Sequence, residues 1–429
     1  MCELIRTIWP VGHGAFYTEV LHTPRGPISV VYDCGGKDTQ IITDNVNHLL
    51  SRLPKANGRP VVDMVFISHF HKDHINGLQY LLKNADVKNL IIPQIDQNAL
   101  LEAYLYNAIT NANGDNGDVD SDEQNIIFQL VQEGEIEGNT NIVQVELYNN
   151  AERPRNDNQE SREESQNKGR QDNEITYDVD NKNPLTNQLS SGQIISVKYL
   201  EEWWEYIPVN VFENAQSKLQ SLINELAKIV YNSTSLVNQG HVDFSLLKSY
   251  LKNNSIKQIK EVYEKVFGKN DNIYSLLLYS GSMKYERQEC NLLRFFGDCL
   301  CDFGECCGRH HCCNCCFEGY IRHAVSCLYT GDFEPESKLN GQTFVNIVRE
   351  ILRERWFYIG MVQIPHHASS NNYSNALYNF PKFAFANVNS HGDISFSQSV
   401  IRDIPWMGCR TMIVTEKDNQ QDFIIHFVP

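Results

Sequence analysis

Short apolar runs, separated by turn residues and helix-like segments, dominate the two ends of the chain. Near the N-terminus, "ISVVYDCGG", "VDMVFIS" and "VKNLIIPQI" are apolar runs of strand length, and "INGLQYLLKN" fits a short helix. Near the C-terminus, such runs occur in "IYSLLLYSG", "HAVSCLYTGDF", "MVQIPHHASS", "KFAFANVNSHGD" and "RTMIVTEKDNQQDFIIHFV". Buried strands that alternate with helices predict an α/β or α+β fold with layered sheets. The last run predicts a two-stranded hairpin around Lys417 to Gln420.

The middle of the chain predicts an insertion over residues 106–268 between two halves of a core, 1–105 and 269–429. Residues 149–183 are almost wholly polar, so we expect them to be disordered or to form a mobile loop. Apolar residues at helical spacing then predict a helical hairpin, with helices at 215–230 and 255–267. Between these segments, an aromatic patch fits either a hydrophobic anchor of the insertion or a surface that stacks on bases. It consists of Trp203, Trp204 and Tyr206.

Composition sets outer limits on the class of protein. The chain has 429 residues, of which 41% are apolar, enough for the core of one large or two medium domains. A net charge of −16 argues against a broad basic surface for nucleic acid. We find no signal-peptide pattern and no run near the ~20 apolar residues of a membrane span. We therefore expect a cytoplasmic protein without a membrane partner, with reduced cysteines.

The segment "FISHFHKDHINGL", residues 66–78, places four metal-binding side chains at the end of an apolar run. His69 and His71 point the same way if the segment is extended, because side chains alternate there. Asp73 and His74 then turn towards a second point as a helix begins. Imidazole and carboxylate groups in this order suit two divalent ions, such as zinc or manganese. The alternative is a chance cluster of surface histidines.

Three later apolar runs also end in residues that bind metals. Asp332 follows the first of them, and a carboxylate there suits a bridge between two ions. His366 and His367 follow the second, and His391 follows the third. One such residue alone is a weak signal, because aspartate after glycine is common in turns. Four strand ends that each deliver a ligand-type side chain predict one shared site.

These segments together resemble the hydrolases of the metallo-β-lactamase fold. "HFHKDH" matches their His-x-His-x-Asp-His signature, and "TGD" at 330–332 is similar to their bridging-aspartate motif. "VGHGAF" and "YDCGG" resemble their first hairpin and Asp-x-Gly turn. "PHHAS" and His391 look most like the branch of the competence DNA-uptake protein's hydrolase domain and the phosphorylcholine esterases. The resemblance covers residues 5–100 and 270–429.

The resemblance implies an αβ/βα sandwich with two divalent ions at one edge, most simply zinc, with manganese as the alternative. Its ligand set carries over residue by residue. The implied ligands are His69 and His71 for the first ion, Asp73, His74 and His391 for the second, and Asp332 as the bridge between them. Many members have a further histidine on the first ion, and here Asn272 or Tyr274 falls near that place. Ala368 replaces a glycine of the branch.

The same resemblance implies roles in catalysis. Asp73 is expected to be essential as a ligand, and Asp33 is expected to orient a ligand from behind. His366 and His367 would lie near the substrate and contact a phosphoryl oxygen or protonate the leaving group. Two ions that lower the pKa of a water would then drive hydrolysis, with a phosphodiester of a nucleic acid or nucleotide as the first substrate. His13 fits a place near the site and a structural turn equally well.

A second group of ligands lies in "CLCDFGECCGRHHCCNCC", residues 299–316. Thiolates at such short spacing suit a structural zinc ion in a hairpin, although adjacent cysteine pairs match no single zinc-finger pattern. Free or redox-active thiols and a disulfide staple are the alternatives. The cysteines are Cys299, Cys301, Cys306, Cys307, Cys312, Cys313, Cys315 and Cys316.

Two other functions stay open at this level. The fold also serves hydrolases of esters, thioesters and lactones, and the negative net charge favours a small substrate. The missing histidine and the insertion would instead suit a regulatory subunit with a degraded site. Such a subunit would bind a protein partner through the insertion, for example in a defence system.

Overall fold

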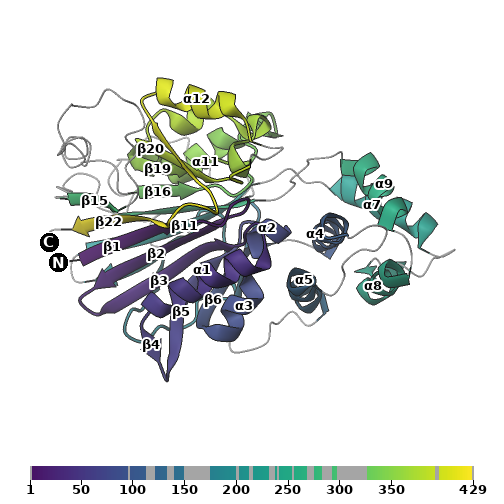
Figure 1. The fold of residues 1–429 in the computed structure, drawn as a ribbon, viewed down its shortest axis with the longest axis horizontal. Coiled ribbons are helices and arrows are strands. Elements are labelled where there is room, and N and C mark those ends of the chain that lie inside the picture. Colours follow the sequence, from purple (N-terminus) through teal and green to yellow (C-terminus); the bar gives the residue numbers. More distant parts are fainter. Residues whose placement is uncertain are drawn as a thin grey trace, which may run out of the picture.

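The chain folds into two β-sheets that pack face to face, with helices on their outer faces (Figure 1). This computed structural model confirms the predicted α+β sandwich. It describes residues 2–94, 97–112, 121–132, 140–148, 174–199, 202–211, 216–230, 237–238, 241–253, 256–267, 275–282, 292–296, 326–391 and 396–427. Within these ranges, each helix is too short or too polar to cross a membrane.

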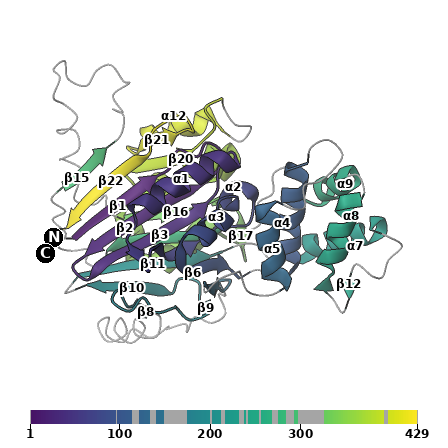
Figure 2. The same ribbon diagram turned by 60° about the horizontal axis from the view of Figure 1, so that its bottom comes forward.

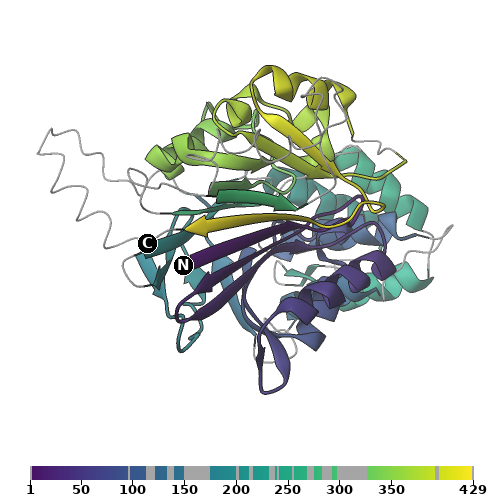
Figure 3. The ribbon, with the colours of Figure 1, turned by 60° about the vertical axis from the view of Figure 1, so that its left-hand side comes forward.

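The first sheet has ten strands and carries the N-terminal half of the chain. Its strands, in spatial order, are β15 (Leu292–Phe296), β22 (Gln421–Phe427), β1 (Cys2–Ile8), β2 (Phe16–Thr23), β3 (Gly26–Cys34), β5 (Arg59–Phe66), β6 (Asp86–Pro93), β7 (Asn141–Val145) and β9 (Gln188–Leu189). The short β4 (Lys55–Ala56) pairs with β5. Because β1 pairs with β22, the two ends of the chain lie close together (Figure 3).

The second sheet has eight strands. In spatial order they are β21 (Arg410–Val414), β20 (Phe383–Asn387), β19 (Ile359–Gln363), β16 (Ser326–Tyr329), β14 (Leu276–Ser282), β11 (Glu202–Asn210), β10 (Ile194–Tyr199) and β8 (Glu174–Tyr177). Two small hairpins lie outside both sheets: β12 (Val237–Asn238) with β13 (His241–Val242), and β17 (Lys338–Leu339) with β18 (Gln342–Thr343).

Helices cover the outer face of each sheet (Figure 1). The first sheet is covered by α1 (Thr39–Arg52) and α3 (Leu78–Asn84), and the second by α11 (Phe344–Leu352) and α12 (Gln398–Trp406). Five more helices gather at one end of the sandwich (Figure 2). They are α4 (Gln97–Thr110), α5 (Asp122–Gln132), α7 (Gln216–Ile229), α8 (Phe244–Asn253) and α9 (Ile256–Phe267).

Burial on both faces explains why the strands read as continuous apolar runs. In β14, Leu276 and Leu278 point into the core between the sheets, whereas Leu277 and Tyr279 point into the core under the outer helices. In β3, Val30 likewise faces the other sheet, and Val31 faces the helices. Strands covered on both sides lack the apolar–polar alternation of a half-exposed sheet.

The predicted C-terminal hairpin is wrong. β21 pairs in parallel with β20 in the second sheet, and β22 pairs with β1 and β15 in the first. A tight turn does form between them, where Asp418 accepts a hydrogen bond from the Thr415 amide at 2.6 Å. The turn therefore carries the chain from one sheet to the other, because each strand completes a different sheet edge.

The segment expected to be an insertion contributes strands to both sheets. Within 106–268, β7 and β9 extend the first sheet, and β8, β10 and β11 extend the second. The boundary expected at residue 105 falls inside helix α4. The expected helices at 215–230 and 255–267 correspond to α7 and α9, and α8 lies between them in the sequence.

One further expectation about this segment is corrected, and one of the two alternatives for the aromatic patch is excluded. The end of the stretch expected to be disordered, residues 174–183, forms β8 and a turn held by Lys182, which pairs with buried Asp63 at 2.9 Å. The earlier part, 149–173, lies outside the described residues. Trp204 and Tyr206 on β11 are fully buried between the sheets, so they cannot stack on bases.

A buried ion pair lies in the core between the sheets. Arg6 on β1 is fully buried, and its Nε lies 2.8 Å from Oε1 of Glu19 on β2. Ser280 and Tyr329 of the second sheet donate hydrogen bonds to the same carboxylate at 2.6 and 2.8 Å. Burial alone would lower the pKa of Arg6, but Glu19 outweighs it and raises that pKa. Arg6 therefore stays charged, and the hydrogen bonds from Ser280 and Tyr329 to Glu19 join the two sheets.

Candidate metal centre

The candidate ligands meet at one edge of the sandwich because strands of both sheets end there. β5 leads into residues 67–71 and the short helix α2 (Lys72–Ile75). β16 leads into 330–332 and β19 into 364–368, whereas His13 lies in the loop between β1 and β2. The backbone around Gly35, after β3, approaches α2 closely. A Cβ on Gly35 would lie 2.2 Å from the carbonyl oxygen of Asp73.

One group of ligand atoms surrounds Asp332, which is 3% exposed. Its Oδ1 lies 3.3 Å from Nε2 of His74, and its Oδ2 lies 3.6 Å from Nε2 of His69. The ligand atoms of these three residues all lie within 4.8 Å of one another. His366 also contacts this carboxylate, with its Nε2 3.7 Å from Asp332 Oδ2.

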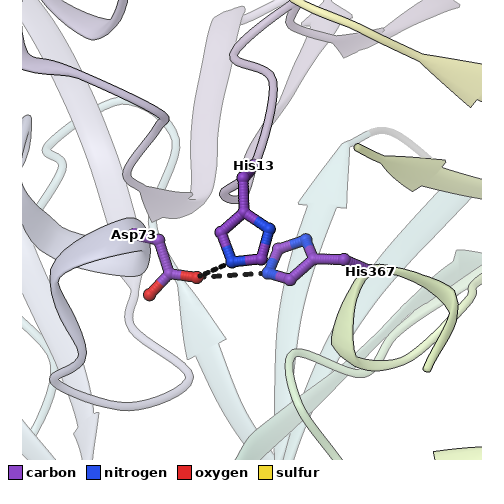
Figure 4. A group of neighbouring side chains, drawn as sticks. All are labelled: His13, Asp73 and His367. Atoms are coloured by element: carbon purple, nitrogen blue, oxygen red, sulfur yellow. Dashed lines mark hydrogen bonds and ion pairs between the residues drawn. The ribbon is translucent and has the colours of Figure 1, made fainter. Parts of the chain in front are cut away.

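A second group surrounds Asp73 (Figure 4). Its Oδ2 lies 3.3 Å from Nε2 of His13 and 3.2 Å from Nε2 of His367. Asp73 also lies 3.7 Å from Nε2 of His74, which links this group to the first. The two groups therefore share a border at His74, as two neighbouring ion sites would.

Four histidines of the centre have their Nδ1 atoms held by the protein. His74 Nδ1 lies 2.8 Å from Oδ2 of Asp33, and His367 Nδ1 lies 3.0 Å from the carbonyl oxygen of Asn387. His69 Nδ1 lies 3.0 Å from Oγ of Ser68. The Ser68 hydroxyl donates to Asp33 and its amide donates there too, so its oxygen accepts from the imidazole.

The fourth histidine is held by an amide. His366 Nδ1 lies 3.0 Å from Oδ1 of Asn372. The Asn372 amide nitrogen donates to the carbonyl oxygens of Asp332 and Phe333, so its Oδ1 is left to accept. In all four histidines, Nδ1–H therefore donates and Nε2 faces a carboxylate with its lone pair when the ring is neutral.

This arrangement fits divalent metal ions. The Nε2 atoms of His69 and His74 are buried and make no hydrogen bond among the described residues. A lone pair facing an ionised carboxylate at 3.2–3.7 Å is repulsive unless a cation lies between them. A donor behind Nδ1 is also the usual way in which proteins orient a metal-binding imidazole. The residues present therefore match the chemistry of the implied ions.

The protonation states of these groups also fit bound metal ions. Burial alone would raise the pKa of Asp332 and of Asp73, but nearby histidines lower both well below the usual range. Burial and the charge of His74 lower the pKa of His69, and burial and His13 lower that of His367. Both rings are therefore neutral, which is the form that binds metals.

His74 and Asp33 each affect the pKa of the other. Burial alone would lower the pKa of His74, but three carboxylates outweigh it and raise that pKa well above the usual range. Burial raises the pKa of Asp33, although His74 and Ser68 oppose it. Without a cation between its Nε2 and Asp332, His74 therefore carries a proton. A bound ion would displace that proton.

The remaining candidates lie outside the two ligand groups or outside the described residues. His71 belongs to neither group, and its Nε2 lies 3.6 Å from Oε1 of Glu102 on α4. His391, expected on the second ion, lies exposed in the turn after β20 and belongs to neither group. The cysteine segment 299–316, Asn272 and Tyr274 lie outside the described residues.

Sequence reasoning left two contributors unassigned. In the sequence, His13 fits a turn and the site equally well, and the glycines on both sides are its only signal. Gly12 and Gly14 both have positive φ, which turns the loop so that His13 reaches Asp73. Glu102 gave no signal, because it lies on a helix far along the chain from the histidine motif.

Glu416 connects the loops beside the site through hydrogen bonds. Its carboxylate accepts hydrogen bonds from Lys37 at 2.8 Å and from the amide and hydroxyl of Ser390 at 2.9 and 2.6 Å. Burial alone would raise its pKa, but these partners outweigh it and lower the pKa from 4.5 to about 2. The interaction therefore stabilises the fold above about pH 4.5 and is lost as the pH falls towards about 2.

We expect Glu416→Gln to lower the free energy of unfolding by about 1–3 kcal/mol at pH 7, because charge-assisted hydrogen bonds are weakened. The difference from wild type should shrink as the pH falls from 4.5 to about 2. Urea unfolding at pH 7, 4.5 and 3 measures it. A difference that stays constant with pH would show that the Glu416 charge does not stabilise the loops.

Comparisons with known proteins give little further information. No family model matches the chain, and no curated protein matches it. Twelve chains of solved structures match, among them unliganded yeast PDE1. That match has 9% sequence identity and a TM-score of 0.33, and covers 99% of this chain and 100% of that one. Similarity at this level establishes neither a shared fold nor a shared activity.

Proposed function

We propose that this protein is a metal-dependent hydrolase with two neighbouring divalent-ion sites, and that its substrate is a phosphodiester. One observation carries the proposal. Four histidines have Nδ1 held by a protein acceptor, and their Nε2 atoms face two carboxylates, the buried Asp332 and the partly buried Asp73. Bound divalent ions supply Lewis acidity and a nucleophile derived from water near neutral pH.

The protein's own residues would orient and divide the site. His69, His74 and Asp332 would hold one side of it, and Asp73 and His367 the other, with His74 at the border. Asp33 and Ser68 lie behind the rings and fix their orientation. Three consecutive residues at 366–368 adopt positive φ, which aims both histidines into the centre at some cost in backbone strain.

The open side of the centre indicates where a substrate would bind. The side chains of His13, Asp73 and His366 are 34%, 20% and 17% exposed, whereas His69 and His74 are 5% and 0% exposed. His366 is thus accessible and held by Asn372, which suits contact with a phosphoryl oxygen or protonation of a leaving group. The "PHHAS" resemblance supports a phosphodiester, and the charge of −16 favours a small one over a polymer.

Alanine variants of His367 and His391 are expected to differ in whether they keep the second ion. We expect His367→Ala to lose one bound Mn²⁺ per chain, because its Nε2 contacts Asp73. His391→Ala should keep all bound Mn²⁺, because His391 lies outside both groups. Counting free Mn²⁺ by electron paramagnetic resonance measures this. Loss of an ion from the His391 variant alone would return His391 to the ligand set.

A substrate panel tests the reaction. Protein loaded with Zn²⁺ or Mn²⁺ is given bis(p-nitrophenyl) phosphate, cyclic nucleotides, single-stranded DNA, a thioester and a lactone, with and without a chelator. We expect chelator-sensitive cleavage of the small diesters and slow cleavage of DNA. Turnover of the thioester or lactone alone would overturn the phosphodiester assignment. Metal binding with no turnover of any substrate would favour the regulatory alternative.

A further inference from the structure

Glu102 brings a buried carboxylate to the side of the centre where His71 lies. It sits in the middle of α4, is 2% exposed, and places Oε1 3.6 Å from Nε2 of His71. Two ligand atoms of one tetrahedral zinc ion, each about 2.1 Å from the metal, are about 3.4 Å apart. The observed separation is therefore close to that of two ligands of a shared ion.

Two aromatic residues hold this contact in place. Tyr263 on α9 donates a hydrogen bond to Oε1 of Glu102, and the Tyr263 ring packs among the helices at this end. Tyr106, one turn after Glu102 on α4, stacks on the His71 ring, with centroids 3.8 Å apart and planes 16° apart. A phenol behind the carboxylate and a ring against the imidazole fix both groups, as supporting residues do in metal sites.

The buried carboxyl group of Glu102 has few polar neighbours among the described residues. In the described part of the chain, no lysine or arginine pairs with Glu102, and the imidazole of His71 faces it there. The His71 ring lies next to His69, with centroids 4.6 Å apart. Nε2 of His69 is buried without a hydrogen bond among the described residues. His71 is therefore next to both the Glu102 carboxyl group and the His69 ring, and a buried carboxylate is costly unless it is paired or bound to metal.

We propose that Glu102 is a ligand of the ion bound by His69 and His71, and supplies the ligand that the sequence lacks after its His-x-His pair. The inference rests on the proposed metal centre and adds His71 and Glu102 to its ligands. Two histidines with one glutamate are an established ligand set for zinc in hydrolases. Helices α4 and α9 would then be part of the metal centre, and ion binding would stabilise their packing.

Metal binding by purified full-length variants tests the proposal without measuring activity. Wild type, Glu102→Gln, Tyr263→Phe and Glu261→Gln are titrated with Mn²⁺, which thiolates bind poorly, and free Mn²⁺ is counted. Glutamine keeps the shape and an oxygen for Tyr263 but removes the charge. Glu261 is exposed on α9 and serves as the matched control. Circular dichroism and thermal unfolding without metal verify that each variant is folded.

We expect wild type and Glu261→Gln to bind two ions, and Glu102→Gln to bind one of them about tenfold or more weakly. Tyr263→Phe should weaken the same ion by a smaller factor, because only the supporting bond is lost. Unchanged affinities in Glu102→Gln would overturn the role of Glu102 and leave the proposed function standing. Absence of Mn²⁺ binding by folded wild type would overturn both.

Discussion

Asp332→Asn should reduce the rate of phosphodiester hydrolysis by about 10³-fold or more and release at least one bound ion. The Asp332 carboxylate lies within 3.7 Å of Nε2 atoms from three histidines that come from two different sheets. An amide of the same shape keeps one oxygen but loses the charge that attracts the cations. Metal content and initial rates, measured on the same preparation, give both results.

Asp403→Asn is the matched control, because Asp403 is 49% exposed on α12 and pairs only weakly with the adjacent Arg402. Its metal content and rate should equal those of wild type. Unchanged metal content in Asp332→Asn would contradict the role of Asp332 as a ligand. Lost activity with full metal content would instead confine Asp332 to a role in binding the substrate.

The largest expected effect on stability comes from Glu19. Glu19→Ala should lower the free energy of unfolding by about 3–5 kcal/mol, because it leaves the fully buried Arg6 without its carboxylate. Ser280 and Tyr329 would lose their acceptor as well. Urea unfolding monitored by tryptophan fluorescence measures the change, since Trp204 is buried in the same core.

A double variant separates the buried charge from the lost packing. Arg6→Met with Glu19→Leu removes both charges and fills similar space, so it should be much closer to wild type than Glu19→Ala. A loss below about 1 kcal/mol in Glu19→Ala would mean that the pair does not join the sheets as the contacts indicate. Because Tyr329 ends the strand that delivers Asp332, metal affinity should also fall in Glu19→Ala.

Local sequence signals were sufficient for most of the site. His69, Asp73 and His74 lie within one short segment after a strand, and Asp332, His366 and His367 follow strands with readable apolar runs. Their positions depend on local geometry, namely strand ends that meet at one edge. Glu102 could not be found this way, because a helix glutamate with apolar neighbours looks like any solvated charge until the tertiary fold brings it to His71.

The sequence predicts the fold class, but it does not predict which sheet each strand joins. Apolar runs indicate that β21 and β22 are strands, and the residues Lys417 to Gln420 indicate a turn between them. They do not indicate which sheet each strand joins, because that depends on free edges elsewhere in the chain. For the same reason, β7 and β11 appeared to belong to an insertion, although their partners are strands from both halves of the core.

Metal content is the most direct test of the central claim. Purified wild type and an Asp73→Ala, His74→Ala double variant are compared by elemental analysis. The cysteines of 299–316 are the same in both proteins, so any ion that they bind cancels in the difference. The account predicts that the double variant carries at least one fewer ion per chain. Equal metal content in the two folded proteins would contradict a metal centre at this edge of the sandwich.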